Sequence, residues 1–391
     1  MVSAVRAVHN LMADYHVMIV AGEASGDLNG SAVANHLLQS SSNVRLTGVG
    51  SSGMREAGVE LLCDSSDWGV IGLVDALRIS PRLIGELRRL KKYLAEVRPA
   101  LLLLIDYPFF NMCLAKTAHA LGIPVVYYFP PSSWSRKSRY AADLAELAAW
   151  VATPFPWSAD ILAEAGCKAE FVGHPVLDWV KPLLSKEDLA RIFKLDINAY
   201  TIGLMPGSRA SEIKHILPVM LKAAEIVSSR VKGVSFVLIK APNLSLSVLQ
   251  PLLKHTSAEI TITDRYPYDV MALCNQMLVT SGTATLEAAA AGVPMTVVYR
   301  SNFLTWIQAR LFLKIPFISM PNIILDRPVI TELLQYEAGP DRIAEEVCSL
   351  MADPQRAVVM KQQLAMAVGS LGETGANRKV AEKILEMLRK S

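Results

Sequence analysis

The sequence predicts an α/β protein built from two doubly wound, Rossmann-like domains that face each other across a cleft. Short β-branched or apolar runs alternate with helical patterns along the whole chain. The strand-like runs are continuously apolar, which is typical of parallel sheets covered by helices on both faces. The chain has 391 residues, which favours two domains over one. In such sheets ligands bind at the carboxyl ends of the strands.

The predicted strands divide into two series. The first half contains VMIVAG, VRLTGVG, LLLLIDY, PVVYYF, WVATPF and EFVGHP, and the second half contains TIGLMPG, SFVLIKAP, EITITD, QMLVTSG and PMTVVYR. Between them, KPLLSKEDLARIFKLDINAY is charged and lacks a strand pattern, so we place a linker at about residues 180–200. We expect one domain at 1–180, a second domain at 181–350, and a helical tail at 351–391 that packs on the first domain or on a partner subunit.

Composition excludes several classes of protein. Hydrophobic residues make up 52% of the chain and charged residues 19%, which indicates a globular protein, and a net charge of +3 is too small for general nucleic-acid binding. Five dispersed cysteines without a C-x-x-C pair, and seven histidines without ligand spacing, predict neither disulfides nor a metal site. No apolar run approaches the ~18 residues of a membrane span, and no export signal is evident. We expect a cytoplasmic protein without a cofactor.

The segment LMPGSRASEI predicts an anion-binding loop between a strand and a helix. Gly207 lets backbone N–H groups approach an anion, Ser208 adds a hydroxyl, and the planar guanidinium of Arg209 can grip phosphate oxygens. The alternative is a solvated arginine paired with Glu212.

The segment TSGTATLEA predicts a second anion site at the start of an alanine-rich helix. Small and hydroxylated residues at a helix N-terminus suit a diphosphate, because the free N–H groups and the helix dipole favour negative charge. The residues of this turn are Ser281, Gly282, Thr283, Ala284 and Thr285. One turn later, Glu287 can accept hydrogen bonds from ribose hydroxyls, although the serine and threonines are also ordinary helix caps.

Two acidic strand ends occur in the first half. In LLLLIDYPFFN, Asp106 follows five apolar residues, and a partly desolvated carboxylate has a raised pKa that suits a general base; alternatively it caps the next turn. In AGEASGDLNG, Glu23, Ser25 and Asp27 suit sugar hydroxyls because carboxylates repel a pyrophosphate. Alternatively, Ser25 or Asp27 caps a helix at 28–38. A sugar in one domain and a nucleotide diphosphate in the other describe a glycosyltransferase.

Five segments together carry a family resemblance. AGEASGDLNG, FVGHPVLD, LMPGSRASEI, TSGTATLEA and MPNIILDRPVITELLQ occur in the same order in the lipid-A-disaccharide synthases, and the resemblance runs from about Val17 to Gln335. It implies the GT-B fold and an inverting transfer of 2,3-diacylglucosamine from its UDP-linked form to 2,3-diacylglucosamine 1-phosphate. The domain at 1–180 would bind the acceptor and the domain at 181–350 the UDP-sugar donor. The products would be a β-1,6 disaccharide and UDP.

The resemblance also implies roles for single residues. Asp106 matches the first aspartate of the family's I-D-x-P motif and would be the catalytic carboxylate, and Arg209 would neutralise the departing diphosphate. GT-B enzymes generally use no bound metal, so arginine and helix N-termini would supply the positive charge.

Four further residues would contact substrate. Asn322 and Arg327 match polar positions near the nucleotide, Glu287 matches the carboxylate that holds ribose, and His174 lies close to the domain junction, where a structural role is equally plausible.

Departures from the family pattern leave the acceptor open. Phe109 replaces the second aspartate of I-D-x-P-D-F-N, and the segment PPSSWSRKSRY is one residue shorter than the family's. The alternatives are a GT-B relative that acts on another UDP-sugar, such as an epimerase, an enzyme with a different lipid acceptor, or a non-catalytic UDP-sugar- or lipid-binding paralogue. A NAD-dependent dehydrogenase is disfavoured because the first turn is not G-x-G-x-x-G.

One stretch predicts binding to a membrane surface. Apolar residues precede a basic helix here, and anionic bilayers attract such a combination. The apolar members are Trp68, Val70, Ile71, Leu73, Val74 and Leu77, and the basic members are Arg78, Arg82, Arg88, Arg89, Lys91 and Lys92. A second patch surrounds Trp306. We expect a peripheral protein on the inner face of the cytoplasmic membrane, unless these residues are simply core and solvated helix face; a homodimer stays open.

Overall fold

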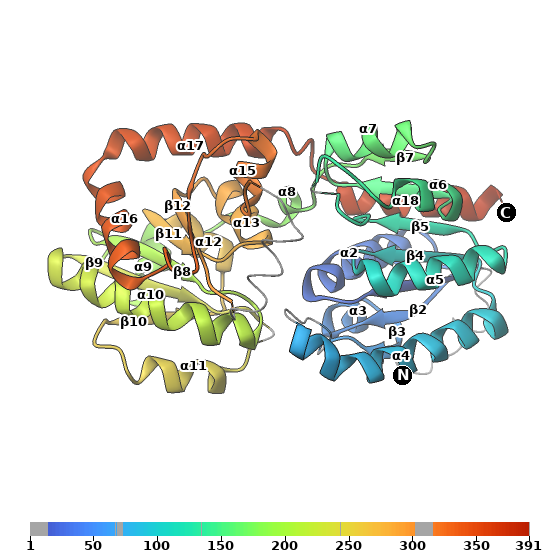
Figure 1. The fold of residues 1–391 in the computed structure, drawn as a ribbon, viewed down its shortest axis with the longest axis horizontal. Helices are drawn as coiled ribbons and strands as arrows, with labels where there is room; N and C mark the ends of the chain where they lie inside the picture. Colours follow the sequence, from blue (N-terminus) through green and yellow to red (C-terminus); the bar gives the residue numbers. More distant parts are fainter. Residues whose placement is uncertain are drawn as a thin grey trace. The chain divides into compact units, whose positions relative to one another are not determined.

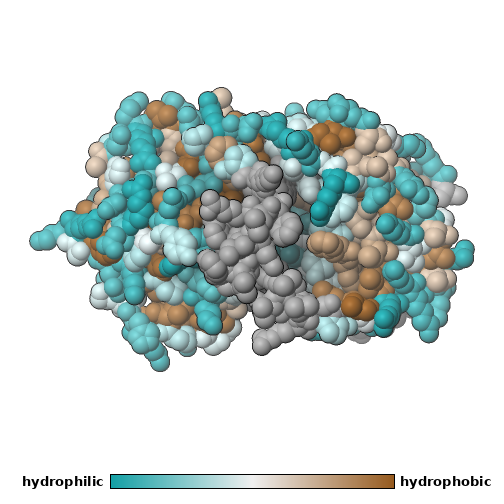
Figure 2. Space-filling view, viewed as in Figure 1, coloured by the Kyte–Doolittle hydropathy of each residue, from teal (hydrophilic) through white to brown (hydrophobic). Residues whose placement is uncertain are grey.

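The computed structural model describes residues 15–66, 68, 73–133, 135–242, 244–301 and 316–390, with the backbone alone for 73–80. The chain divides into two compact units (Figure 1). Unit 1 comprises Met1–Pro175 and Leu371–Ser391, and unit 2 comprises Val176–Ser370. Figure 2 shows hydrophilic residues (teal) interspersed with hydrophobic ones (brown), which form a contiguous group in the right half of the view. Many of the apolar side chains are buried in the cores of the two units.

Unit 1 contains a seven-stranded parallel sheet in the order β3-β2-β1-β4-β5-β6-β7. Its strands are β1 (Tyr15–Ala21), β2 (Val44–Gly50), β3 (Glu60–Asp64), β4 (Leu101–Ile105), β5 (Val125–Tyr128), β6 (Trp150–Thr153) and β7 (Ala169–Phe171). Its helices are α2 (Ala24–Ser40), α3 (Ser52–Glu56), α4 (Leu73–Val97), α5 (Pro108–Ala120), α6 (Ala141–Leu147), α7 (Pro156–Glu164) and α18 (Ala376–Lys390). Helices α2 and α18 share one core with the sheet, and α4, α5 and α6 share the other (Figure 1).

Unit 2 contains a six-stranded parallel sheet in the order β10-β9-β8-β11-β12-β13. Its strands are β8 (Tyr200–Met205), β9 (Val234–Ile239), β10 (Ile260–Thr263), β11 (Gln276–Val279), β12 (Met295–Tyr299) and β13 (Thr331–Leu334). Its helices are α8 (Val176–Trp179), α9 (Lys186–Phe193), α10 (Ala210–Arg230), α11 (Leu246–Leu253), α12 (Pro267–Leu273), α13 (Thr283–Ala290), α15 (Met320–Leu325), α16 (Pro340–Ala352) and α17 (Pro354–Gly369). Helices α10 and α16 share one core, and α12, α13 and α17 share the other.

Both sheets reverse their strand order beside their first strand, which creates a topological switch point. In unit 1 the switch lies between β1 and β4, where Ala21 pairs with Ile105. In unit 2 it lies between β8 and β11, where Met205 pairs with Val279. The loops that follow these four strands therefore lie side by side in each unit, and most of the predicted site residues lie in or just after them. His174, Asn322 and Arg327 lie elsewhere, after β7 and around α15.

The C-terminal segment is shared between the units. Helix α17 packs against α13 in unit 2, whereas α18 packs against α2 in unit 1. The predicted tail at 351–391 thus contains helices of both units, and the first boundary falls after Pro175 rather than at 180. Within the described ranges, no helix combines the length and the apolar character that crossing a membrane requires.

Candidate active site

Asp106 lies at the carboxyl edge of β4 in an unusual backbone conformation. Asp106 and Tyr107 both have φ near +49°, in the left-handed region, before Pro108 begins α5. Left-handed conformations are uncommon outside glycine, and for a bulky tyrosine they signal strain that the surrounding structure must hold. Such strain is concentrated at functional sites. The half-buried Asp106 therefore has a strained backbone conformation at the switch point of unit 1.

The turn after β1 is built around Tyr107. A Cβ on Gly22 would lie 2.3 Å from the Tyr107 Cγ, so glycine here makes room for the tyrosine ring. Burial, and to a lesser extent the nearby Glu23 carboxylate, raises the pKa of Tyr107 to about 12. Glu23 and Tyr107 thus lie close together at the carboxyl edge of the sheet, beside the turn that follows β4 and contains Asp106. Helix α2 already begins at Ala24, so the predicted helix start at Leu28 is wrong and Ser25 lies within the first helical turn.

Asp27 holds a neighbouring loop. Its carboxylate accepts hydrogen bonds from the backbone N–H groups of Ser51 (2.5 Å), Gly53 (2.9 Å) and Met54 (3.2 Å), and the residue is only 6% exposed. Both oxygens are engaged at the start of α3, so Asp27 caps that helix rather than its own. This arrangement gives Asp27 a structural task and argues against the predicted sugar contact.

His174 is buried among aromatic rings. Its ring centroid lies 5.6 Å from that of Phe129 and 5.5 Å from that of Phe155, and burial lowers its pKa to about 3. Its backbone N–H donates to the Leu371 carbonyl (3.0 Å), where the chain re-enters unit 1. A buried imidazole that is neutral at pH 7 fits the structural alternative.

In unit 2, Arg209 is the last residue of the loop between β8 and α10. Gly207 has φ +120°, which favours glycine, and a Cβ there would lie 2.8 Å from the Glu212 Cβ. Glu212, 8% exposed, accepts from the Ser208 N–H (3.0 Å) and from Arg209 Nη1 (3.0 Å). The Arg209 side chain is 27% exposed, so it is paired and oriented rather than freely solvated. The loop thus presents a fixed guanidinium at the switch point of unit 2.

The turn before α13 divides into structural and accessible residues. Ser281 Oγ donates to the Ile318 carbonyl (2.7 Å), and the buried Thr285 Oγ1 donates to the Gly282 carbonyl (2.8 Å) and accepts from the Met320 N–H (3.2 Å). These hydroxyls attach the turn to the segment before α15. In contrast, Gly282 (φ +119°) and Thr283 are exposed, and Ala284 is half-buried. The start of α13 is therefore open to a ligand.

Glu287 lies one turn into α13. Burial raises its pKa to about 7, and its charge raises the pKa of Tyr268, which shows that the two side chains lie near each other. A carboxyl group that titrates near neutral pH in this position is able to accept hydrogen bonds once ionised.

Asn322 and Arg327 differ sharply in their surroundings. The Asn322 carboxamide donates to the Ile330 carbonyl (3.0 Å) and to Glu332 Oε1 (2.9 Å), and it accepts from the N–H groups of Val329 (2.7 Å) and Ile330 (2.9 Å). At 1% exposure it has no capacity left for a ligand, so the predicted nucleotide contact by this side chain is not supported. Arg327 is exposed on the following turn.

Glu332, on β13, is a residue that the sequence analysis missed. Its carboxylate accepts from the Ile318 N–H (3.0 Å), the Ser319 N–H (2.9 Å), Ser319 Oγ (2.5 Å) and Asn322 Nδ2. Because Ser281 is bonded to Ile318, Glu332 indirectly supports the turn before α13.

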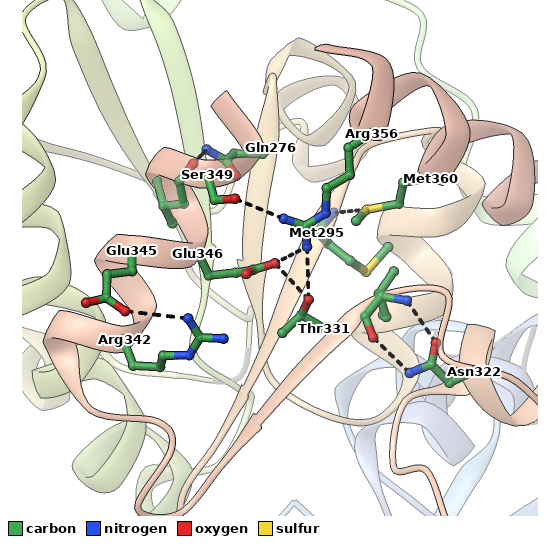
Figure 3. A network of polar contacts seen from close by, with 12 residues as sticks. Gln276, Met295, Asn322, Thr331, Arg342, Glu345, Glu346, Ser349, Arg356 and Met360 are labelled. Atoms are coloured by element: carbon green, nitrogen blue, oxygen red, sulfur yellow. Dashed lines mark hydrogen bonds and ion pairs between the residues drawn. The ribbon is translucent and has the colours of Figure 1, made fainter. Parts of the chain in front are cut away.

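A second carboxylate, that of Glu346 on α16, accepts a hydrogen bond from Thr331 Oγ1 (2.7 Å), and Thr331 precedes Glu332 on β13. Figure 3 shows Arg356 of α17 between Glu346 and Thr331, an ion pair and hydrogen-bond network that joins α16 and α17 to the strand. Figure 3 also shows Asn322 in its separate set of contacts.

Two cavities, of about 180 and 380 Å³, lie elsewhere in unit 2. Both cavities are lined in part by Lys186, Tyr200 and Asn275. Tyr200 begins β8 and Asn275 precedes β11, so the cavities lie at the amino ends of the strands, opposite the candidate site. In the part of the chain that the structure describes, no group of three or more His, Cys, Asp or Glu residues is arranged to hold a metal ion.

The predicted membrane patch is only partly described. Trp68 is 0% exposed and packs against Phe110 (ring centroids 4.8 Å apart) and Tyr107 (5.8 Å), so its prediction as a surface residue is wrong. Val70, Ile71 and Trp306 lie outside the described residues, and the structure describes only the backbone of Leu73, Val74, Leu77 and Arg78. Lys91 is half-buried, and four basic members are exposed on α4: Arg82, Arg88, Arg89 and Lys92.

Comparison with known proteins agrees with this architecture. The S. aureus MnaA–UDP co-structure has a TM-score of 0.66 at 12% identity and covers 96% of this chain and 97% of its own. CalG4, the calicheamicin glycosyltransferase, has a TM-score of 0.60 at 17% identity and covers 96% and 98%. These similarities confirm the predicted fold class of two Rossmann-like domains.

Sequence similarity is more specific. Lipid-A-disaccharide synthase of Geobacter sulfurreducens is 37% identical over 376 residues, covering 96% of this chain and 98% of the relative. The family model described as Lipid-A-disaccharide synthetase matches residues 17–386, nearly the whole chain. The chain therefore belongs to the lipid-A-disaccharide synthetase family, as the sequence motifs predict.

Proposed function

We propose that this protein transfers 2,3-diacylglucosamine from its UDP-linked form to 2,3-diacylglucosamine 1-phosphate, which yields a β-1,6 disaccharide and UDP. Family membership supports the reaction class. The observation that carries the proposal is the strained backbone of Asp106, which places a carboxylate at the switch point of unit 1. Arg209 occupies the corresponding edge of unit 2.

Unit 2 is the proposed donor site. The loop Gly207–Arg209 and the exposed start of α13 flank its switch point, so backbone N–H groups and a guanidinium can share one diphosphate. Arg209 would stabilise the charge that develops on UDP as it leaves. Glu287, in its ionised form, would accept hydrogen bonds from the ribose hydroxyls.

Unit 1 is the proposed acceptor site, with Asp106 as the general base. Asp106 would take the proton from the acceptor 6-hydroxyl as its oxygen bonds to the anomeric carbon. The bond from that carbon to UDP breaks on the opposite face, so the configuration inverts. Glu23 lies near Tyr107 on the same edge and is the more plausible of the first-turn acids for sugar hydroxyls, because the Asp27 carboxylate is occupied.

Acylated substrates imply contact with a membrane surface. We infer peripheral binding at the inner face of the cytoplasmic membrane, supported by the exposed cations of α4 and the exposed Ile84 beside them. A cation near an anionic surface contributes about 1 kcal/mol of binding. Cosedimentation with anionic vesicles, at low and high salt, would test this part of the proposal.

The test of the function is direct. Purified protein is incubated with UDP-2,3-diacylglucosamine and 2,3-diacylglucosamine 1-phosphate, and mass spectrometry is used to detect the disaccharide and UDP. Formation of both products supports the proposal. Conversion of UDP-N-acetylglucosamine to an epimer would indicate the other enzyme class, and UDP binding without turnover of any donor would indicate a non-catalytic protein.

A further inference from the structure

The main-chain carbonyl of Asp106 is held by two buried side chains. The Tyr127 hydroxyl donates to it at 2.9 Å and Asn111 Nδ2 at 2.7 Å. Tyr127 comes from the adjacent strand β5 and Asn111 from the first turns of α5, and both are 0% exposed. A carbonyl oxygen has two lone pairs, and here side chains use both of them.

These two donors act on the strained part of the backbone. The carbonyl belongs to the peptide between Asp106 and Tyr107, the two left-handed residues. Fixing the plane of this peptide fixes ψ of Asp106 and φ of Tyr107. The Asp106 N–H donates in addition to the Tyr128 carbonyl (3.0 Å), so the backbone of Asp106 is bound to β5 on both sides.

Tyr127 is suited to this task. Burial, and secondarily the nearby Asp106 carboxylate and Tyr140, raises the pKa of Tyr127 well above its ordinary value, although its contact with Asn111 acts in the opposite direction. Its hydroxyl therefore stays protonated and remains a donor throughout the physiological range. Burying donor groups such as this hydroxyl and Asn111 Nδ2 is costly unless they donate hydrogen bonds. The Tyr127 hydroxyl donates to the Asp106 carbonyl, and Asn111 Nδ2 donates to it and to the Ile105 carbonyl (3.1 Å), so their convergence on this stretch of backbone is a specific feature of the fold.

We propose that Tyr127 and Asn111 are positioning residues, which hold the Asp106 carbonyl and thereby fix the orientation of the Asp106 carboxylate for proton transfer. The inference rests on the proposed role of Asp106 as general base. It assigns to two core residues a part in the rate of the reaction, beyond their part in stability.

The informative variant is Tyr127→Phe, because phenylalanine fills the same space and removes only the hydroxyl. Tyr93→Phe is the matched control: it makes the same change in the same unit, where the Tyr93 hydroxyl lies 3.4 Å from Thr47 Oγ1 on β2. We expect Tyr127→Phe to lower kcat about 3- to 10-fold, the factor that one lost hydrogen bond commonly carries. KM for the UDP-linked donor should stay unchanged, and Tyr93→Phe should leave both constants unchanged.

A double-mutant cycle with Asp106→Asn separates positioning from other effects. If Tyr127 acts through Asp106, Tyr127→Phe has no further effect on the residual rate of the Asp106→Asn enzyme. An equal loss of kcat in both backgrounds, or a loss of thermal stability in Tyr127→Phe with unchanged kcat, would overturn the inference. If instead Asp106→Asn alone retains the full rate, the proposed base is wrong, which is a different outcome from the failure of the positioning role.

Discussion

Replacing Arg209 tests the proposed donor site most closely. Arg209 Nη1 pairs with Glu212 at 3.0 Å, and Glu212 is itself only 8% exposed. Arg209→Ala therefore removes the proposed phosphate ligand, and it also leaves a nearly buried carboxylate without its cation in the loop after β8. A charge-assisted hydrogen bond contributes about 1.5–3 kcal/mol, which corresponds to a roughly 10- to 100-fold fall in rate beyond any loss of UDP affinity.

The chain offers a control for the negative charge on Glu212, which Arg209→Ala leaves without its Arg209 partner. In the double variant Arg209→Ala/Glu212→Gln, the glutamine retains an acceptor for the Ser208 N–H but no longer repels the diphosphate. We expect the double variant to bind UDP more tightly than Arg209→Ala. Arg209→Lys should recover little of the rate, because an ammonium lacks the planar fork of donors.

Isothermal titration with UDP and steady-state kinetics provide the assay. The reasoning is refuted if Arg209→Ala binds UDP and turns over like the parent, because the loop after β8 would then not be the diphosphate site.

Further predictions concern Asp27, Glu287 and Glu332. Asp27→Ala should lower the free energy of unfolding by about 2–4 kcal/mol, measured in urea, because three backbone amides lose their acceptor, while UDP affinity stays unchanged. Unchanged stability with lost acceptor binding would favour a sugar contact instead. Ionised Glu287 should bind ribose better, so UDP affinity should rise from pH 6 to pH 8 around the pKa of about 7, and Glu287→Gln should abolish that rise. Because burial raises this pKa in the folded state, the stability that Glu287 contributes falls as the pH rises from about 4.5 to 7, and Glu287→Gln should stabilise the protein more at pH 8 than at pH 5. Glu332→Gln should weaken UDP binding several-fold, because it loosens the turn before α13. Glu346→Gln is the control: it affects the Arg356 network, so it should lower the free energy of unfolding and leave UDP affinity intact. Equal effects of the two variants on UDP affinity would contradict the role of Glu332.

Much of the fold is predictable from the sequence, because the central strands are continuously apolar. LLLLI and VVYY form β4 and β5, which are fully buried within their sheet. The two strands absent from the prediction, β3 and β13, are edge strands, and polar residues such as Glu60 and Glu332 interrupt their apolar pattern. Half-exposed edges allow such residues, so the pattern there is weak.

The candidate site is predictable only in its loops. Motif position identifies the turns after β1, β4, β8 and β11, but it cannot show whether a polar side chain faces a ligand or the protein backbone. The partners of Asp27 lie 24 to 27 residues away, on a loop that only tertiary folding brings near. The Asn322 side chain is hydrogen-bonded to the backbone of Val329 and Ile330, just before β13. Glu332 lies on β13 itself, a strand that the sequence did not predict.

Two other features depend on packing alone. Nothing in the letters of IDYPFFN indicates the left-handed conformation of Tyr107, since the proline marks only the start of a helix. Trp68 lies in a stretch with the composition of a membrane patch, yet it fills the core beside Phe110.

The most direct test of the account compares the parent protein with Asp106→Asn in the synthesis of disaccharide from UDP-2,3-diacylglucosamine and 2,3-diacylglucosamine 1-phosphate, with UDP affinity measured on the same samples. The account predicts that the variant binds UDP within a few-fold of the parent and forms disaccharide about 10²-fold more slowly or worse, the usual scale of a lost general base. Disaccharide formation at the parental rate, or an equal loss of UDP affinity and rate, would contradict the role of Asp106 as the base.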